Sequence, residues 1–234
     1  MKWNTIGLIG AMQEEIELMQ QVLEQQESVQ KAGISFIKGQ YAGKNVILCR
    51  CGVGKVNAAV CTQLLVDHFQ VDVVLFTGVA GALDPSLDIG DIVISTDCIQ
   101  HDMDASVLGF PRGTIPFAEV SVFEAEPELV KLAADCSRKV FEGRTLEGRI
   151  LSGDQFIASR ETVKQLYEEL GGACTEMEGA AVAQVCVMNK VPFVIIRSMS
   201  DKADGSAHVN FAEFTVRASA NSHQIIEQIL QNIE

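Results

Sequence analysis

Residues 175–183 read TEMEGAAVA, so two carboxylates, Glu176 and Glu178, come directly before a run of very small side chains. This pattern predicts a helix over 178–189 that packs closely against its neighbours. The free backbone N–H groups at the first turn of such a helix favour negative charge. A carboxylate held there is suited to accept two hydrogen bonds from the diol of a ribose. The spacing of Thr175 and Glu178 equally fits a T-x-x-E capping box, which needs no ligand, so both interpretations stay open.

The segment that follows predicts a buried strand. Residues 192–201, PFVIIRSMSD, form an apolar and β-branched run that opens after a proline. Three polar side chains, Arg197, Ser200 and Asp201, gather towards its C-terminal end, and residues 202–205 predict a turn. In open α/β sheets, ligands bind outside the carboxyl ends of strands. These three residues are therefore candidates for a functional site.

Glycine-rich turns follow three other predicted strands, over residues 6–10, 45–50 and 72–76. The turns cover 10–12, 51–54 and 77–82, and we expect their backbone to line one shared pocket. The second turn fits neither nucleotide motif, because a dinucleotide fingerprint needs glycine at Asn57 and a P-loop needs Ser or Thr at Val56. Glu15 lies close to the first turn, either as a solvated glutamate of a first helical turn or as a site residue.

The other elements complete an α/β pattern. We expect strands over 35–41, 92–100 and 149–152, and helices over 127–141, 161–170 and from about 211 to the end. No internal repeat, low-complexity tract or linker interrupts this order. The sequence therefore predicts one domain that covers residues 1–234.

The composition excludes several classes of partner. A formal net charge of −13 argues against a nucleic-acid or anionic-membrane partner, since both need a positive protein surface. The seven cysteines are scattered, without a C-x-x-C pair or zinc spacing, which predicts free thiols in a reducing cytoplasm. No signal-peptide core is present, and no apolar run reaches the ~18 residues of a membrane span.

Three predicted loops carry residues suited to a metal site, a subunit interface or a base-binding surface. His101-Asp102-Met103-Asp104 resembles a metal site, but without further histidines nearby we expect a hydrogen-bonded structural cluster and no metal. The loop over 105–120 carries Leu108 and Phe110 among glycines and prolines, which predicts a subunit interface. Residues 153–157 offer Phe156 and Ile157 to cover a flat base, although core packing explains these two side chains equally well.

Five motifs occur together, in the order and spacing of one known family: GAMQEE (10–15), GVGKV (52–56), SGDQF (152–156), EME (176–178) and RSMSD (197–201). The chain resembles the bacterial 5′-methylthioadenosine/S-adenosylhomocysteine nucleosidases of the nucleoside phosphorylase superfamily over essentially its whole length. The resemblance implies a three-layer α/β/α sandwich with a mixed central sheet, a homodimer, and no metal or organic cofactor. It implies an adenine nucleoside as the small-molecule partner.

The resemblance also implies roles for individual residues. Glu15 would activate water, Asp201 would protonate adenine N7 with the help of Ser200, and Glu178 would hold the ribose hydroxyls. Further substrate contacts are implied for Met12, Val53, Val79, Ala80, Gly81, Phe156, Ile157, Glu176, Met177, Arg197 and Phe211. The neighbouring subunit would contribute Ala105, Leu108, Phe110 and Pro116 to cover the 5′-substituent.

This assignment agrees with the chemistry of the bond. Departing adenine is a poor anion, so an acid must protonate it while a base activates water on the opposite face of the sugar. Val79 stands where many family members carry serine, and Gln100-His101-Asp102 is similar to members that also cleave 6-amino-6-deoxyfutalosine; 5′-deoxyadenosine is a further candidate substrate. Two alternatives are a phosphorolytic nucleoside phosphorylase and a non-catalytic nucleoside-binding protein. A phosphorolytic enzyme needs a cationic cradle, and the first turn carries Glu14 and Glu15 instead.

Overall fold

The most apolar segments of the chain become the central strands of one mixed sheet. The computed structural model describes residues 2–201 and 207–233. Strand β1 (Thr5–Gly10) pairs in parallel with β4 (Lys44–Arg50) and with β5 (Val73–Ala82), and β5 pairs in parallel with β10 (Phe193–Asp201). All nine residues of β10 are buried, which agrees with the strand predicted over 192–201. The carboxyl ends of these four strands therefore lie at one edge of the sheet.

Beyond β10, the sheet curves back on itself. Strand β10 pairs antiparallel with β6 (Ile92–Gln100), and β6 pairs in parallel with β8 (Thr145–Ser152). Strand β8 then pairs with β9 (Gly172–Glu176), whose partner is again β5, so five strands close a ring. On the other side, β3 (Ile34–Tyr41) and β2 (Glu24–Lys31) extend the sheet, and β7 (Phe123–Glu124) pairs with β6.

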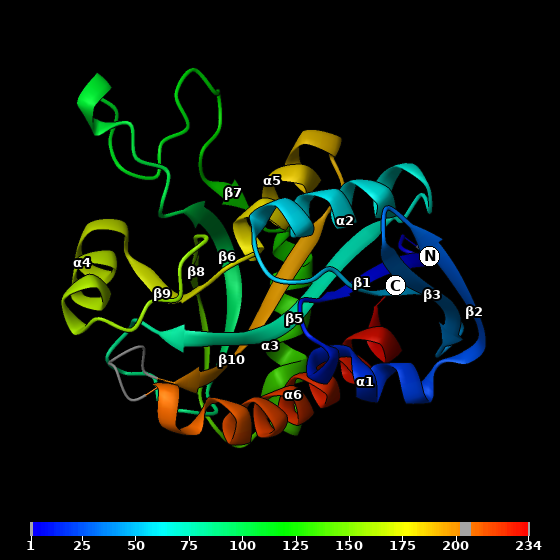
Figure 1. The fold of residues 1–234 in the computed structure, drawn as a ribbon. Helices are drawn as coiled ribbons and strands as arrows, with labels where there is room; N and C mark the ends of the chain where they lie inside the picture. The colour runs from blue at the N-terminus through cyan, green and yellow to red at the C-terminus, as the bar shows by residue number, and fades with distance from the viewer. Residues whose placement is uncertain (1, 202–206, 234) are drawn as a thin grey trace.

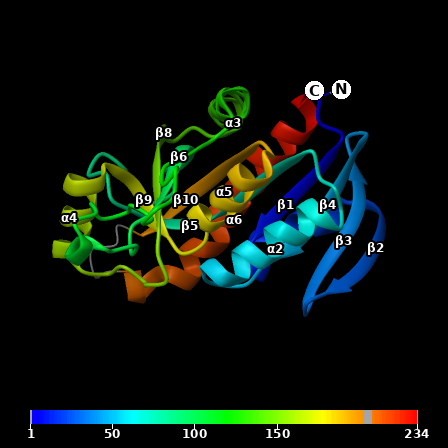
Figure 2. The same cartoon turned by 90° about the horizontal axis from the view of Figure 1, so that it is seen from above.

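Helices cover both faces of the sheet (Figures 1 and 2). Helices α2 (Lys55–Asp67) and α5 (Gly179–Asn189) pack together on one face. Helix α6 (Ala207–Asn232) packs against α1 (Gln13–Val22) and α3 (Pro127–Val140) on the other, and α4 (Arg160–Leu170) lies beside β9. This arrangement confirms the predicted α/β fold with a mixed sheet and flanking helices. Among the described helices, none combines the length and the apolar character that a membrane crossing requires.

The structure differs from the prediction at residues 77–82 and at three strands. Residues 77–82 do not form a turn, because they continue β5, where β10 and β9 satisfy their backbone groups. Strands β2, β7 and β9 are absent from the sequence-based prediction. Strand β2 is a polar, exposed edge strand without an apolar pattern, and β9 is a short segment whose five residues are all buried. The turn predicted over 202–205 lies outside the described residues.

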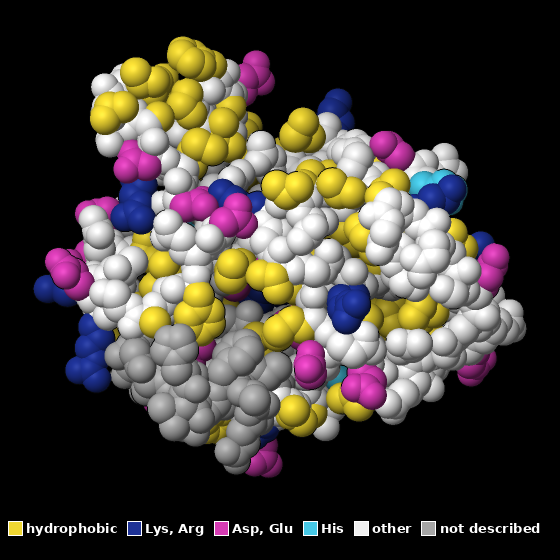
Figure 3. Space-filling model, in the orientation of Figure 1, with side chains coloured by type: hydrophobic (Ala, Val, Ile, Leu, Met, Phe, Trp, Pro, Cys, Tyr) yellow, Lys and Arg dark blue, Asp and Glu magenta, His cyan; other side chains and the backbone are white. Residues whose placement is uncertain are grey.

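One long loop leaves the body of the molecule. Residues 101–122, between β6 and β7, project beyond the helices and contain the short helix η1 (Ser106–Leu108) (Figure 1). Apolar side chains gather on this projection (Figure 3), where Leu108 is 67% exposed and Phe117 is 92% exposed. The rings of Phe110 and Phe117 contact each other edge to face at 5.6 Å. An apolar projection of this kind is typical of a surface that another protein covers.

Candidate active site

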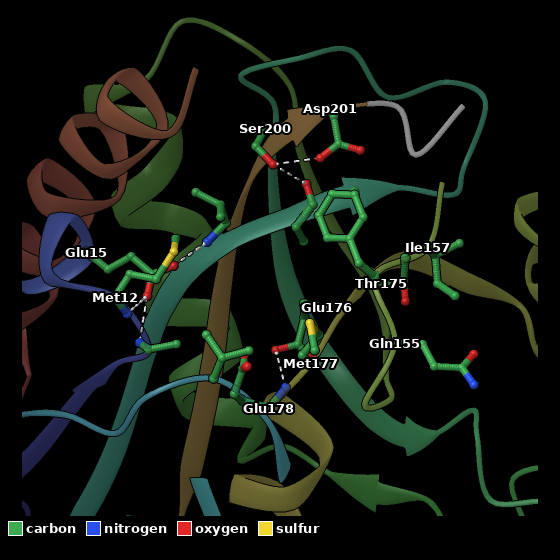
Figure 4. Close-up of a pocket in the computed structure, with 16 residues that line it drawn as sticks. Met12, Glu15, Gln155, Ile157, Thr175, Glu176, Met177, Glu178, Ser200 and Asp201 are labelled. Atoms are coloured by element: carbon green, nitrogen blue, oxygen red, sulfur yellow. Dashed lines mark hydrogen bonds between the residues drawn. The ribbon is translucent and has the colours of Figure 1, made fainter. Parts of the chain in front are cut away.

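One pocket of about 260 Å³ opens where the carboxyl ends of β1, β5, β9 and β10 meet. Its wall includes thirteen of the predicted site residues: Met12, Glu15, Val53, Val79, Ala80, Gly81, Phe156, Ile157, Glu176, Met177, Glu178, Ser200 and Asp201. In Figure 4, Glu15 enters from α1 and Met12 from the residue before that helix, Glu178 from the start of α5, and Asp201 from the end of β10. The structure thus brings three carboxylates from distant parts of the sequence to one nucleoside-sized hollow.

Glu15 is fixed by backbone amides. Its Oε2 accepts hydrogen bonds from the N–H groups of Ala11 at 2.6 Å and Met12 at 2.9 Å, and its Oε1 accepts one from Val79 at 3.1 Å. Burial raises the pKa of Glu15, although Arg197 and these three amides act in the opposite direction. A carboxylate with a raised pKa is a stronger base than a solvated one. The interpretation of Glu15 as a solvated glutamate is therefore wrong.

Gly78 in β5 makes room for this arrangement. A Cβ atom at Gly78 would lie 2.8 Å from Glu15 Oε1 and 3.1 Å from Arg197 Nη1, so any side chain there would displace the carboxylate. Gly78, one of the glycines that suggested a turn in this segment, therefore permits a close approach inside a strand.

Arg197 lies beneath the pocket and is not among the residues of its wall. The side chain is almost fully buried, forms an ion pair with Glu176 through Nη2 at 2.6 Å, and stacks over the Phe76 ring at 3.9 Å. Arg197 supplies a positive charge under a pocket that contains several carboxylates. Its effect on the site is electrostatic, since the ion pair and the ring already occupy its polar and planar surfaces.

Glu176 organises the start of α5. Its two oxygens accept hydrogen bonds from the N–H of Gly179 at 2.8 and 3.0 Å, from the Ser152 hydroxyl, and from Arg197. Thr175 lies in β9, and the side chain of Glu178 does not cap the helix. The capping-box interpretation is therefore wrong: the cap comes from Glu176, one residue after the expected threonine.

Glu178 points its carboxylate into the pocket. Its Oε1 accepts a hydrogen bond of 2.7 Å from the N–H of Gly54, in the turn before α2. Burial, followed by the nearby charge of Glu176, raises the pKa of Glu178 to about 8, although the Gly54 amide acts against this shift. A partly satisfied, buried carboxylate of this kind retains acceptor capacity for hydroxyl groups of a ligand.

Asp201 and Ser200 occupy the end of β10. The register between β10 and β5 shifts between Met199 and Asp201, and such a bulge redirects side chains at the end of a strand. The Ser200 hydroxyl donates a hydrogen bond of 2.9 Å to Asp201 Oδ2, and both residues are buried. This contact agrees with the expectation that Ser200 orients the carboxyl of Asp201.

Apolar side chains line the rest of the pocket. Phe156 is 51% exposed, so core packing does not explain its position. Ile157 lies on the pocket wall and also packs against a small cluster that contains Leu151 and Leu166. Ile157 thus contributes both to the packing of this cluster and to the pocket wall, whereas Phe156 lies on the pocket wall with about half of its surface exposed.

Several predicted residues lie elsewhere. Ala105, Leu108, Phe110 and Pro116 belong to the projecting loop and do not line this pocket. Phe211 lies in α6, but its side chain is outside the described part of the structure. Ala11, Gln155 and Thr175 line the pocket and were not predicted, although each is the immediate neighbour of a predicted residue.

His101 differs from its prediction. The ring is fully buried, and neither ring nitrogen has a hydrogen-bond partner among the described residues. Burial lowers the pKa of His101, which favours the neutral ring. The expected hydrogen-bonded cluster is therefore wrong for the histidine, whereas Asp102 and Asp104 accept hydrogen bonds from other residues. Within residues 2–201 and 207–233, no group of three or more His, Cys, Asp or Glu side chains is arranged to hold a metal ion.

Comparison with known proteins finds close similarity over the whole chain. The model of the Phosphorylase superfamily matches residues 5–231. A 5′-methylthioadenosine/S-adenosylhomocysteine nucleosidase of Staphylococcus carnosus (strain TM300) is 41% identical over 234 residues, which cover 97% of this chain and 100% of that protein. Among solved structures, the nucleosidase of Neisseria meningitidis in complex with methylthio-immucillin-A has a TM-score of 0.94 and 37% identity, covering 98% and 100% of the two chains. The futalosine hydrolase of Helicobacter pylori strain 26695 has a TM-score of 0.93 and 34% identity, covering 98% of each.

Proposed function

The chain belongs to the phosphorylase superfamily and, within it, to the 5′-methylthioadenosine/S-adenosylhomocysteine nucleosidases, and we propose that Asp201 and Glu15 carry the two proton transfers by which it releases adenine. The enzyme is an N-glycosyl hydrolase. Water adds its oxygen to C1′ of the sugar while the bond between C1′ and adenine N9 breaks. Glu15 takes one proton of the water, and Asp201 gives a proton to N7, so that adenine leaves as a neutral molecule.

The burial of both groups supports these roles. Glu15 is held by three backbone amides and has a raised pKa, so its ionised form is a competent base for a water molecule. Asp201 lies at the end of another strand and is oriented by Ser200. Acid and base thus come from separate elements, as a reaction on two faces of a sugar requires.

The sugar takes the place between them. The positive charge that develops on the ribose favours a nearby carboxylate, and Glu178 supplies one from the start of α5. Met177 and Phe156 on the pocket wall offer apolar surface to the sugar and the base. Glu176 contributes by holding α5 and Arg197 in place rather than by binding the hydroxyls, because its oxygens already accept at least four hydrogen bonds.

The observation that carries the proposal is the meeting of Glu15, Glu178 and Asp201 at one pocket whose described wall holds no Lys or Arg. Phosphate would need such a cation, so hydrolysis is favoured over phosphorolysis. We expect equal rates of adenine release from methylthioadenosine with and without inorganic phosphate, measured on purified protein. A rate that rises with phosphate would indicate a phosphorylase, and binding of the nucleoside without adenine release would indicate a non-catalytic binding protein.

The range of 5′-substituents follows from the same pocket. Val79 offers only its backbone N–H to Glu15 and an apolar side chain to the cavity, so it adds no side-chain hydrogen bond to a substrate. We propose that 5′-deoxyadenosine and 6-amino-6-deoxyfutalosine are further substrates, and similarity to a futalosine hydrolase supports the second. Parallel assays of adenine release from the four nucleosides give their ranking by kcat/KM.

We further propose a homodimer in which the projecting loop reaches the pocket of the neighbouring subunit. The side chains of Leu108 and Phe117 in the loop, Val56 on α2 and Met188 on α5 are exposed and apolar. Helices α2 and α5 lie on the side of the molecule to which the loop projects (Figure 1). Buried thiols at all seven cysteines and the identity of the relatives support a cytoplasmic location. No metal or organic cofactor takes part in the proposed steps.

Shortening one apolar side chain of the loop tests this dimer. Leu108→Ala is expected to raise KM for adenosylhomocysteine about tenfold, and KM for 5′-deoxyadenosine much less, because a subunit-bridging side chain contacts only a long 5′-group. Val216→Ala removes a similarly exposed side chain from α6 and serves as the control. Equal changes of KM for both substrates, or a monomeric mass by light scattering of the wild-type protein, would contradict the arrangement.

A further inference from the structure

Three residues outside the pocket wall, Lys55, Asp102 and Asp154, form a closed ring of interactions through side chains and two backbone amides. The backbone N–H of Lys55 donates to Asp154 Oδ1 at 2.8 Å, and the backbone N–H of Asp154 donates to Asp102 Oδ2 at 2.9 Å. Asp102 Oδ1 accepts from Lys55 Nζ at 2.6 Å, which closes the ring. The side chains of Lys55 and Asp102 are each only 17% exposed. Three segments far apart in the sequence therefore meet here: the start of α2, the loop after β6 and the loop after β8.

The ring continues into the body of the protein. Lys55 Nζ also donates to Gln100 Oε1 at 3.1 Å, and Gln100 Nε2 donates to Gln184 Oε1 on α5 at 2.6 Å. Burial opposes the ionisation of Asp102, but hydrogen bonds from Lys55 and from the Asp154 amide more than offset it and lower the pKa of Asp102. The Lys55–Asp102 ion pair is therefore anchored on both sides and differs from a mobile surface pair.

Lys55 and Asp154 are each adjacent in sequence to a segment that shapes the pocket. Lys55 directly follows Gly54, whose N–H donates to Glu178. Asp154 directly precedes Gln155, Phe156 and Ile157, which line the pocket. Gly54 has a φ of +97°, and a Cβ atom there would lie 3.1 Å from Asp154 Oδ1, so the two segments are in close contact. Two successive amides, of Gly54 and Lys55, thus point to two carboxylates, one in the pocket and one in the ring.

We propose that Lys55, Asp102 and Asp154 are positioning residues that hold the sugar-binding carboxylate and the base-covering loop in register with each other. The inference rests on the proposed function, because it assigns Glu178 to the ribose and residues 155–157 to the base. It also gives a role to two residues that had none: the lysine of a turn that is not a P-loop, and the first aspartate of the segment His101–Asp104.

The position of the ring predicts which kinetic constant changes. Glu15 is held by amides of residues 11, 12 and 79, and Asp201 by Ser200, so neither proton-transferring group depends on the ring. Loss of the ring loosens the grip on sugar and base, which raises KM, while the fall in kcat stays small because the Gly54 amide still donates to Glu178. A purely structural ion pair would change thermal stability without this effect on KM.

The test compares Lys55→Met and Asp102→Asn with the wild-type protein, in steady-state assays of adenine release from methylthioadenosine. Each variant is expected to raise KM about tenfold, with kcat within about threefold of wild type. The double variant is expected to raise KM no more than either single one, because both changes break the same pair. Lys55→Arg keeps a donor to Asp102 and is expected to restore KM to within about threefold of wild type.

Asp97→Asn provides a matched control. Asp97 lies in β6, the strand that precedes the loop with Asp102, and accepts from Arg149 Nε at 2.5 Å in an ion pair of comparable burial, away from the pocket. We expect it to lower the melting temperature without raising KM. If Lys55→Met and Asp102→Asn behave in the same way as Asp97→Asn, or if Lys55→Arg fails to restore KM, the ring has no positioning role. Turnover by the wild-type protein tests the proposed function separately, since an inactive wild type contradicts the function and an unchanged KM in active variants contradicts only the ring.

Discussion

Asp201→Asn is expected to lower kcat for methylthioadenosine by about 10²–10⁴-fold, the range that a general acid contributes, while KM stays within a few fold of wild type. Asparagine has nearly the shape of aspartate, and its carbonyl oxygen is able to accept the hydrogen bond from the Ser200 hydroxyl. The variant therefore keeps the geometry of the strand end. It lacks only a proton that can be transferred to adenine.

An activated substrate separates this chemical role from a structural one. The 4-nitrophenyl glycoside of 5-methylthioribose carries a leaving group that departs as an anion without protonation. Asp201→Asn is expected to cleave it at a rate close to that of the wild-type protein. A rate loss of equal size for both substrates would contradict the role of Asp201 as the acid, and so would an unchanged kcat for methylthioadenosine.

Glu15→Gln is expected to cause a loss of about 10²–10⁴-fold in kcat as well, because the variant has no base for the attacking water. The 4-nitrophenyl glycoside should not restore the activity of Glu15→Gln, since water must still be deprotonated when the leaving group needs no acid. This contrast with Asp201→Asn makes the two assignments independently testable. Cleavage of the 4-nitrophenyl glycoside by Glu15→Gln at a rate close to wild type would contradict the role of Glu15 as the base.

The structure also predicts a moderate cost in stability for Glu15→Gln. Two amides donate to Oε2 and one to Oε1, so the new amide group must face a backbone N–H. The loss of one such hydrogen bond in a buried place costs about 1–3 kcal/mol, which thermal or urea unfolding measures directly. If kcat falls by several orders of magnitude in protein that remains folded at the assay temperature, the loss is due to the missing base and not to unfolding.

The pH dependence of the wild-type protein is expected to report Glu15 and Glu178, because one must be ionised to act as the base and the other to face the charge on the sugar. The value of kcat/KM should therefore fall as the pH drops through the pKa of each group. Because burial raises both pKa values above the ordinary value of 4.5, the acid limb of the profile should lie above pH 4.5. An acid limb at or below this value in the free enzyme would show that Glu15 is not the group that titrates.

Much of the fold could be predicted from local patterns. An apolar β-branched run specifies a buried strand such as β10, and a strand followed by a glycine turn and a helix places Glu15 at a strand end. The register shift at the end of β10, which directs Asp201, has no such signal in the sequence. Strand β2 lacks an apolar pattern, and the glycines of residues 77–82 suggested a turn because their partners in β9 and β10 lie about a hundred residues away along the chain.

The sequence by itself determined the order of the elements and the chemical types of the site residues, because spacing along the chain controls helix faces, strand faces and turns. Only the tertiary structure decided that Glu176 is occupied by Arg197 and the α5 amides, that Glu178 has a raised pKa, and that Lys55 meets Asp102 and Asp154. The physical reason is that burial and hydrogen-bond partners come from segments that are distant in sequence. A residue's neighbours along the chain carry no information about which of those segments will cover it.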